Sequence, residues 1–432
     1  MMKRMMRWLP MLTAVALSAA AAAMEAETAE GKPGNFFAPG YDAGKELPAD
    51  QVYPRGRIFP FSGFAPADIA AAKKAGFTMA GPVYSAYQEK KLLEGCEKEN
   101  LFLILPIHPE AGGEKLTKKL LDQPRPDFAP YWDDIAAKVR RASTNPRLAW
   151  WYLTPEELRP WRANDMAFLK GALKVIREND PQKRPVWLYL PNHYTREQMR
   201  VFGETLDLVG KGMYPTQLGQ ENDRVWCRWS TESETGAILD AKSDAIPLCV
   251  PEMFRQPSEE QLADLEKIVR HDVYLSLVSG AKGVVVFSLA ERPGFSAHKR
   301  YFDAYASVAT ELTGERKLGE LFLFGKQLDA LKIRTLSGPV TLAVDAGINN
   351  QHDPHEYPAV ASAEIGYRDI RALFLVNSAK GGSVKLLVEG LPEEETEIVD
   401  LFTGQSVVTT GNGSFETSLA PYEVKAFKFV GK

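Results

Sequence analysis

The feature that most constrains this chain is an alternation of short apolar runs with longer amphipathic stretches between residues 51 and 331. Runs that are apolar throughout are typical of parallel strands covered on both faces. Eight such runs lie at residues 57–61, 77–82, 101–107, 148–153, 186–190, 206–213, 246–250 and 284–289. Eight β-α units in this length predict an α/β fold that closes as a (β/α)8 barrel, the TIM-barrel architecture. A doubly wound open sheet is the alternative, but no Gly-x-Gly-x-x-Gly turn follows the first run.

The stretches between these runs have the pattern of helices. Ser258 is followed three residues later by Gln261, which is the spacing of a capping box at a helix start. Apolar residues then recur on one face, so we expect a helix from Ser258 to Val273. A last amphipathic helix is expected from about Glu320 to Leu331.

The pattern of apolar runs and turn residues changes near residue 332. Short runs of β-forming residues alternate with turns that contain Gly and Asn. The candidate strands are at residues 372–376, 384–388, 398–402 and 424–429. We therefore assign residues 51–331 to the catalytic barrel and residues 332–432 to a small C-terminal β-sandwich, an accessory domain.

The N-terminus has the pattern of an export signal. Lys3, Arg4 and Arg7 precede an apolar run from Trp8 to Ala23 that ends in small residues. This predicts a signal peptide over residues 1–23 and a polar linker over residues 24–50. A membrane anchor is the alternative, but the run is short for a bilayer and no second spanning run follows. We expect an exported protein, periplasmic or secreted, with no stable membrane insertion after cleavage.

Charge and cysteine content argue against nucleic-acid binding, a disulfide framework and a zinc site. The formal net charge is −4, and loss of the three basic leader residues would make it about −7. A mildly acidic chain without a basic block does not suit nucleic-acid binding. The three cysteines, Cys96, Cys227 and Cys249, show no paired spacing, so neither a disulfide framework nor a zinc site is indicated. Cys249 lies in an apolar run and is expected in the core.

Two glutamates lie at the carboxyl ends of predicted strands, which is where barrels of this kind carry their active sites. Glu156 follows the fourth apolar run and Glu252 follows the seventh. Cleavage of a glycosidic bond needs two carboxyl groups, of which one protonates the leaving oxygen. A structural alternative is that Thr154 caps a helix in which Glu157 closes a capping box.

The two segments resemble the retaining (β/α)8 glycoside hydrolases of clan A. The run Trp151-Tyr152-Leu153-Thr154-Pro155-Glu156 is similar to the acid/base strand of these enzymes, and Pro247 to Glu252 is similar to their nucleophile strand. The resemblance implies Glu156 as the acid/base and Glu252 as the nucleophile, with Glu156 having the higher pKa because Glu252 lies close. Tyr214 matches a tyrosine that often follows strand six.

Aromatic and polar residues near the predicted strand ends are candidates for contacts with sugar rings and hydroxyls. They are Tyr84, His108, Trp151, Asn192, His193, Tyr214, Arg255 and Arg292. Trp150 and Trp151 must point to opposite faces of their strand, so one of them packs under the helices.

The sequence thus predicts a glycosidase that cleaves an extracellular or periplasmic oligo- or polysaccharide, exo- or endo-acting, by a two-glutamate retaining mechanism without a cofactor. A carbohydrate-binding barrel without catalysis is the first alternative. A metal-dependent barrel hydrolase is the second. Only His108 and His193 lie at predicted strand ends, so few histidines are available as ligands for a metal ion.

Overall fold

Buried apolar segments form the parallel strands of the barrel, as the pattern predicts. The computed structural model describes residues 47–220, 224–347 and 352–431, so the expected signal peptide and residues 24–46 of the expected linker lie outside it. Every residue of the third and fourth barrel strands is buried. The barrel strands are β1 (Phe61–Gly63), β2 (Met79–Ala80), β3 (Phe102–Ile107), β6 (Leu148–Leu153), β7 (Val186–Leu190), β8 (Leu208–Met213), β9 (Ile246–Pro247) with β10 (Val250–Pro251), and β11 (Val284–Val286).

Hydrogen bonding carries the parallel strands around a closed ring. One sheet runs in the order β10-β8-β7-β6-β3-β2, with β9 also on β8, and β1 pairs separately with β11. The bridges Cys249–Val284 and Glu252–Phe287 join β10 to β11. The amide of Thr78 donates to the carbonyl of Phe61 at 3.0 Å, which joins β2 to β1. The prediction of eight barrel strands is therefore confirmed.

Two of the predicted strands differ in their bounds. The first was expected at residues 57–61, but pairing begins only at Phe61. Arg57 instead forms an ion pair with Glu320 at 2.9 Å, which holds the entry to the barrel against the last helix before the C-terminal sheets. The eighth strand ends at Val286 rather than at residue 289.

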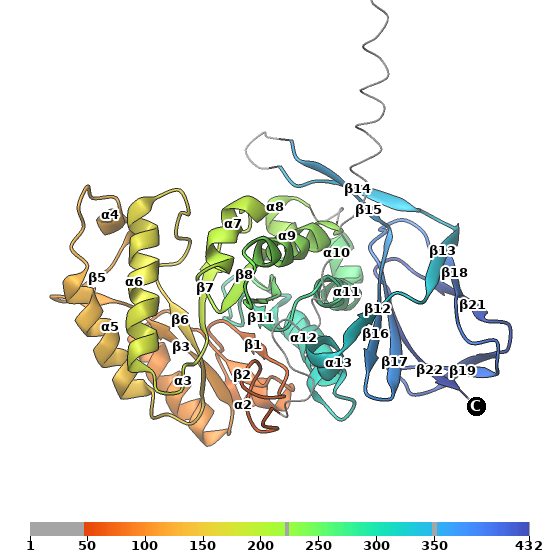
Figure 1. Cartoon of the computed structure of the whole chain (residues 1–432), viewed down its shortest axis with the longest axis horizontal. Helices are drawn as coiled ribbons and strands as arrows, with labels where there is room; N and C mark the ends of the chain where they lie inside the picture. The colour runs from red at the N-terminus through yellow and green to blue at the C-terminus, as the bar shows by residue number, and fades with distance from the viewer. Residues whose placement is uncertain (1–46, 221–223, 348–351, 432) are drawn as a thin grey trace, which may run out of the picture. The chain divides into compact units, whose positions relative to one another are not determined.

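Helices follow the strands and cover the barrel (Figure 1). They are α2 (Ile69–Lys74), α3 (Ala86–Lys98), α4 (Lys118–Leu121), α5 (Ala129–Ala142), α6 (Ala163–Asn179), α7 (Arg196–Gly203), α8 (Pro215–Leu218), α9 (Trp226–Asp240), α10 (Glu259–Ala263), α11 (Leu265–Val278), α12 (His298–Thr313) and α13 (Leu318–Phe324). A two-stranded ribbon, β4 (Glu110–Ala111) with β5 (Glu114–Lys115), follows β3. The capping box of Ser258 and Gln261 is present, but the expected helix is divided at Asp264 into α10 and α11. In the described ranges, no helix has the length and apolar character needed to cross a bilayer.

The C-terminal region contains two larger antiparallel sheets and a hairpin. One sheet has the order β12-β16-β17-β22-β19-β20 and the other β13-β18-β21, while β14 pairs with β15. The strands are β12 (Lys326–Leu328), β13 (Lys332–Ser337), β14 (Thr341–Asp345), β15 (Pro354–Pro358), β16 (Val360–Tyr367), β17 (Ile370–Asn377), β18 (Val384–Glu389), β19 (Thr396–Asp400), β20 (Ser406–Thr410), β21 (Ser414–Leu419) and β22 (Val424–Gly431). One hydrophobic cluster contains residues from both sheets, including Leu375, Leu386 and Phe415.

The chain enters these sheets earlier than the expected boundary near residue 332. The helix expected over residues 320–331 ends at Phe324, where Gly325 takes an extended conformation. The strand β12 then pairs with β16, so residues 326–328 already belong to the C-terminal sheet. Gly325 lies so close to Leu321 and Ile365 that a Cβ at this position would clash, so the turn into β12 requires glycine here.

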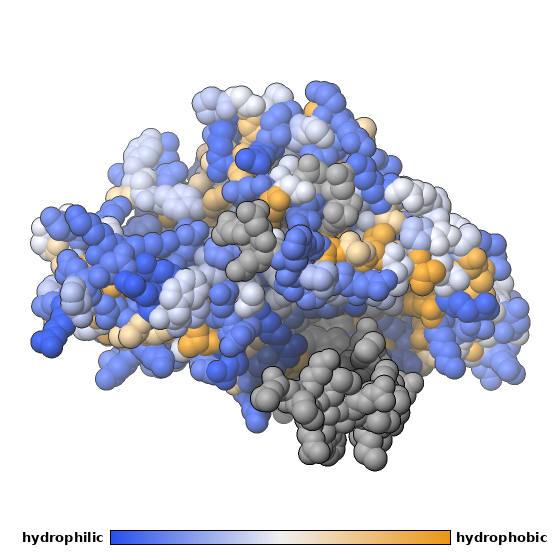
Figure 2. Space-filling model, turned by 90° about the horizontal axis from the view of Figure 1, so that it is seen from above, coloured by the Kyte–Doolittle hydropathy of each residue, from blue (hydrophilic) through white to orange (hydrophobic). Residues whose placement is uncertain are grey.

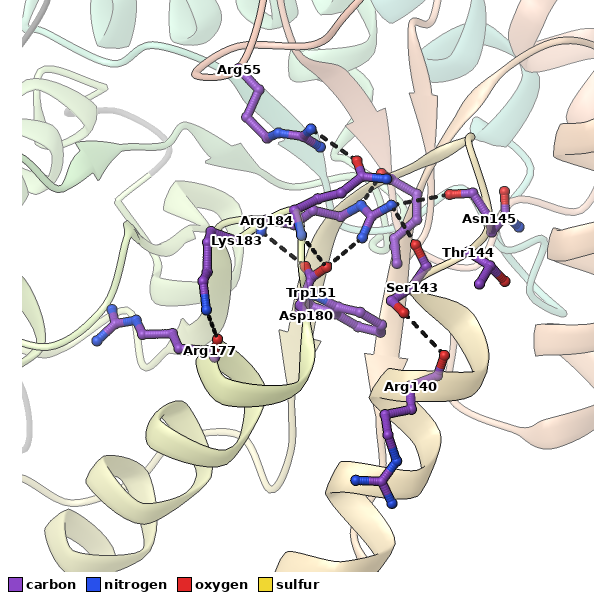
Figure 3. A network of polar contacts seen from close by, with 12 residues as sticks. Arg55, Arg140, Ser143, Thr144, Asn145, Trp151, Arg177, Asp180, Lys183 and Arg184 are labelled. Atoms are coloured by element: carbon purple, nitrogen blue, oxygen red, sulfur yellow. Dashed lines mark hydrogen bonds and ion pairs between the residues drawn. The ribbon is translucent and has the colours of Figure 1, made fainter.

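The two tryptophans of β6 lie in different hydrophobic clusters, because side chains alternate along a strand. Trp150 belongs to the cluster that includes interior barrel residues such as Trp187. Trp151 packs with helix residues such as Leu169, and its indole N–H donates to Asp180 at 2.9 Å (Figure 3). Trp151 is fully buried, so its prediction as a substrate contact is wrong.

Asp180 and Arg184 form a buried polar junction at the base of β6 and β7 (Figure 3). The Arg184 guanidinium donates to Asp180 at 2.7 Å, to the carbonyl of Leu148 at 2.8 Å and to that of Ser143 at 2.9 Å. Burial alone raises the pKa of Asp180, but the hydrogen bonds from Trp151 and from backbone amides outweigh it and lower that pKa. A buried ion pair with all these partners connects α5, α6 and two strands.

We expect Asp180→Ala to lower the free energy of unfolding by about 3–5 kcal/mol, because it leaves the Arg184 charge buried without its carboxylate. Urea unfolding followed by circular dichroism measures the change. The pKa of Asp180 is lower in the folded protein than in the unfolded chain, so Asp180 stabilises the fold at pH values above its unfolded pKa. This stabilisation is lost as the pH falls through the pKa of the folded protein. The difference between wild type and variant should therefore shrink in acid.

The matched control is Asp240→Ala, which breaks the exposed ion pair of Asp240 with Arg196. Exposed pairs contribute at most about 1 kcal/mol, so this variant should unfold almost like the wild type. Equal destabilisation by the two variants would contradict the importance assigned to the Asp180 junction.

Candidate active site

A cavity of about 310 Å³ lies at the carboxyl ends of the barrel strands. This is the face where barrels of this kind carry their active sites. Strand-end segments after β6, β7, β8 and β10, together with β11, supply its walls. Its lining residues are Glu156, Glu157, Tyr189, Pro191, Asn192, His193, Tyr214, Gln217, Phe254 and Phe287. The cavity thus combines carboxyl, amide and imidazole groups with aromatic rings.

Glu156 is a largely enclosed carboxyl group at the end of β6. The hydroxyl of Tyr152, which is fully buried, donates a short hydrogen bond to Oε1 of Glu156. Burial raises the pKa of Glu156, the Tyr152 hydrogen bond lowers it, and the charge of Glu157 raises it again, with a net increase. Glu156 therefore keeps its proton to a higher pH than a free glutamate.

Glu157 is held beside Glu156 by its backbone and by a lysine. Its φ is 56°, in the left-handed region, and its amide donates to the carbonyl of Tyr189 at 3.2 Å. Lys118 donates to its Oε2 at 2.7 Å. The alternative of a helix start at Thr154 is wrong, because α6 begins only at Ala163. Thr154 instead donates to the carbonyl of Ile107 at 3.0 Å.

Glu252 does not line the cavity. Only 4% of it is exposed, and its carboxylate accepts the amides of Thr216 at 2.7 Å and Gln217 at 3.2 Å. These amides belong to the first turn of α8, so Glu252 caps this short helix. Its backbone carbonyl accepts the hydroxyl of Tyr305, from α12, at 2.9 Å.

The surroundings of Glu252 are the helices outside the barrel. Arg224 lies 4.0 Å from its Oε1 and binds Asp272 of α11. His271 bridges Asp272, at 2.9 Å, and the hydroxyl of Ser378 in the C-terminal region, also at 2.9 Å. Burial raises the pKa of Glu252, while Arg224 and Thr216 lower it. The structure therefore does not bring Glu252 into the cavity with Glu156, and the charge that raises the pKa of Glu156 is that of Glu157.

Aromatic rings form much of the cavity wall. Tyr214 stacks on Tyr189 with the ring centroids 6.3 Å apart, and it meets Phe254 edge-on at 5.0 Å. Phe287 lies 5.6 Å from Tyr214. Of these, only Tyr214 was predicted. Tyr189 could have been found from the inward alternation along its strand, whereas the loop conformation that brings in Phe254 leaves no local signal.

Tyr84 and Arg292, two of the predicted substrate contacts, do not line this cavity but lie near Glu156, which does. Burial raises the pKa of Tyr84, the charge of Glu156 raises it further and that of Arg292 lowers it, so all three groups are close together. Tyr84 stacks on Phe64 at 5.9 Å. Arg292 donates to the Ser288 hydroxyl at 2.7 Å.

The other predicted contacts divide into two groups. Asn192 and His193 line the cavity. His108 lines a separate cavity of about 580 Å³ between α3 and α5, and its Nδ1 lies 3.0 Å from the hydroxyl of Thr154. Arg255 is exposed and is not part of the cavity wall.

Cys249 is buried in the core as expected. In the described part of the chain, no group of three or more His, Cys, Asp or Glu side chains is placed to hold a metal ion.

Solved structures share the fold of this chain. No protein-family model matches the sequence, and no curated protein matches it. A β-galactosidase from Bacillus circulans sp. alkalophilus is 10% identical with a TM-score of 0.54, over 87% of this chain and 99% of that one. A glycoside hydrolase family 5 structure from Bacteroides vulgatus is 11% identical with a TM-score of 0.51, over 90% of this chain and 94% of that one. At these identities the likeness establishes the barrel fold.

We expect Tyr152→Phe to raise the pKa of Glu156, because the variant removes the hydrogen bond that favours the ionised carboxylate. A 13C NMR titration of the glutamate side-chain carbonyls measures this value, with Glu156→Gln identifying the signal. Tyr301→Phe is the control, since Tyr301 lies in the environment of Glu252. An unchanged or lower pKa in Tyr152→Phe would contradict the assigned hydrogen bond.

We expect Glu252→Gln to lower the free energy of unfolding by about 1–3 kcal/mol, because the new amide nitrogen faces backbone N–H groups that need an acceptor. Thermal and urea unfolding measure the loss. Glu157→Gln is the matched control, because its side chain is 45% exposed and is held only at the rim by Lys118. Equal stability of the two variants would argue against the capping role of Glu252.

Proposed function

We propose that this protein is a glycoside hydrolase in which Glu156 is the proton donor. The proposal rests on one observation: a buried carboxyl group with a raised pKa lies in an aromatic-lined cavity at the carboxyl ends of barrel strands. A general acid must be protonated when substrate binds, which is the state that this environment favours. The barrel fold, shared with solved glycoside hydrolases, is compatible with this chemistry.

The cavity wall suits a sugar. Rings of Tyr189, Tyr214 and Phe287 offer apolar faces for the C–H surface of a pyranose. Asn192, His193 and Gln217 bring polar groups that can bind hydroxyls. Tyr152 sits below Glu156 and directs its carboxyl group, so that the proton can be delivered to the glycosidic oxygen.

Two residues are candidates for the second carboxyl group of this mechanism, Glu252 and Glu157. Retention with Glu252 as nucleophile, the form implied by the resemblance to clan A, needs the two carboxyl groups about 5–5.5 Å apart. The carboxylate of Glu252, which accepts two amides of α8, would have to lie at this distance from Glu156. Glu157 is the other carboxylate of the cavity wall in the described residues, and it is the candidate for the second role in this structure.

A second candidate function is sugar binding without hydrolysis. The capping of α8 by Glu252 favours it, because a barrel that only binds sugars has no need of a second opposed carboxylate. Both functions share the same ligand class, a carbohydrate.

For the location of the protein we propose export, on the basis of the basic and apolar pattern of residues 1–23. The substrate would then be an extracellular or periplasmic glycan.

We expect Glu156→Gln to lower turnover by about 10²–10⁴-fold while sugar binding is kept, because the amide cannot donate a proton to the leaving oxygen. The measurement is release of reducing ends from a broad panel of glycans by the mature protein, with NMR of the first-formed anomer. Binding by the same variant is followed by calorimetry.

The variants Glu157→Gln and Glu252→Gln separate the alternatives. Loss of turnover in Glu157→Gln, with activity kept in folded Glu252→Gln, would support Glu157 as the second carboxylate. Loss in Glu252→Ala with rescue by azide would restore Glu252 as the nucleophile. Sugar binding without turnover by the wild type would reject hydrolysis in favour of the binding protein.

A further inference from the structure

Three large aromatic side chains are exposed in the described part of the chain, and two of them lie beside the candidate active site. Trp161 is 59% exposed and Tyr84 is 40% exposed. The third, Tyr87, is 68% exposed, and it lines a different hollow on α3. Exposure alone proves little, since single apolar side chains are common on protein surfaces. Figure 2 shows one largely hydrophilic face in which hydrophobic residues occur in small groups.

The loop that carries Trp161 is fixed by polar contacts. Arg159 binds the buried Asp165 at 2.9 Å, and Arg162 binds Asp122 at 2.7 Å. The hydroxyl of Tyr194 donates to the carbonyl of Leu158 at 3.0 Å. The backbone that carries the exposed indole is therefore fixed, which lowers the ordering entropy that stacking on the indole would cost.

A series of rings connects Trp161 with the cavity. The indole meets the buried ring of Tyr194 edge-on, with the centroids 5.8 Å apart. Tyr194 in turn meets His193, a cavity residue, edge-on at 5.2 Å. Trp161 thus rests on Tyr194 while much of its own surface stays free for a ligand.

Strand order and ring contacts place the two exposed rings. Tyr84 follows β2 and stacks on Phe64, which meets the cavity ring of Phe287 at 5.0 Å. Trp161 reaches the cavity through Tyr194 and His193, which follow β7. In the sheet order β7-β6-β3-β2, Glu156 at the end of β6 lies between these two groups.

The size of the cavity makes these outer rings relevant. Cavities of about 300–1,000 Å³ hold one drug-sized ligand, and this one, at about 310 Å³, is at the lower limit. It has room for about one or two sugar rings, so a longer chain must continue across its rim. The rim offers Tyr84 at one end and Trp161 at the other.

We propose that Trp161 is the platform of an additional sugar subsite, and that the substrate is an oligo- or polysaccharide chain that passes from Tyr84 over Glu156 to Trp161. This inference rests on the proposed function and extends it, because it favours action within a chain over removal of a single terminal unit. Trp161 makes a binding contact several rings away from the reacting bond. It takes no part in proton transfer.

The test uses the mature protein with Glu156→Gln, which binds without turnover, and measures affinity by calorimetry. The probes are mono-, di-, tetra- and hexasaccharides of β-1,4- and β-1,3-linked glucans, mannans, xylans and galactans. Affinity should rise with chain length, and adding Trp161→Ala should weaken hexasaccharide binding roughly three- to tenfold, to near the disaccharide value. Trp161→Phe should keep most of the affinity.

Tyr87→Ala is the matched control, since it removes an exposed ring that lines a different hollow and should leave all affinities unchanged. Saccharide binding that does not depend on chain length, or hexasaccharide affinity unaffected by Trp161→Ala, would overturn the subsite and leave the proposed function standing. If no saccharide is bound or cleaved by any variant, the proposed function fails and the subsite fails with it.

Discussion

The structure depends on the closure of short parallel strands into a ring. Each strand pairs with the next in the same direction, and the bridges from β10 to β11 and from β1 to β2 close the circle. Parallel pairing places all carboxyl ends on one face. Residues as distant in sequence as Tyr84, Glu156 and Arg292 therefore come close there, although nothing in their local segments joins them.

Closure also forces charged residues into the layer between strands and helices, where each needs partners. Arg184 is satisfied by Asp180 and by backbone carbonyls of neighbouring elements. Glu252 is satisfied by the amides of α8, with Arg224 close by. A chain of contacts continues from Arg224 through Asp272 and His271 to Ser378, so that the C-terminal region contributes to the setting of α8.

The candidate site combines one carboxyl group of raised pKa with a wall of aromatic rings. Burial is the main cause of the raised pKa of Glu156, and its neighbour Glu157 adds to it. Tyr152 works in the opposite direction and fixes the carboxyl group in place. The same α8 that Glu252 caps supplies Gln217 to the cavity, which makes Glu252 relevant to the site even from outside it.

The eight-strand rhythm, the change to antiparallel sheets and the position of Glu156 at a strand end were predictable from the amino-acid sequence, because they follow from the local hydrophobic pattern and from the order of the strands along the chain. It also placed Asn192, His193 and Tyr214 in the cavity. The direction in which a side chain at a strand end turns depended instead on contacts with distant elements. Trp151 and Glu252 turn to the helix layer because Asp180 and the amides of α8 bind them there. These hydrogen-bond partners come from elements that are distant in the sequence. Neither the hydrophobic period nor a sequence motif predicts which of them a side chain at a strand end will bind.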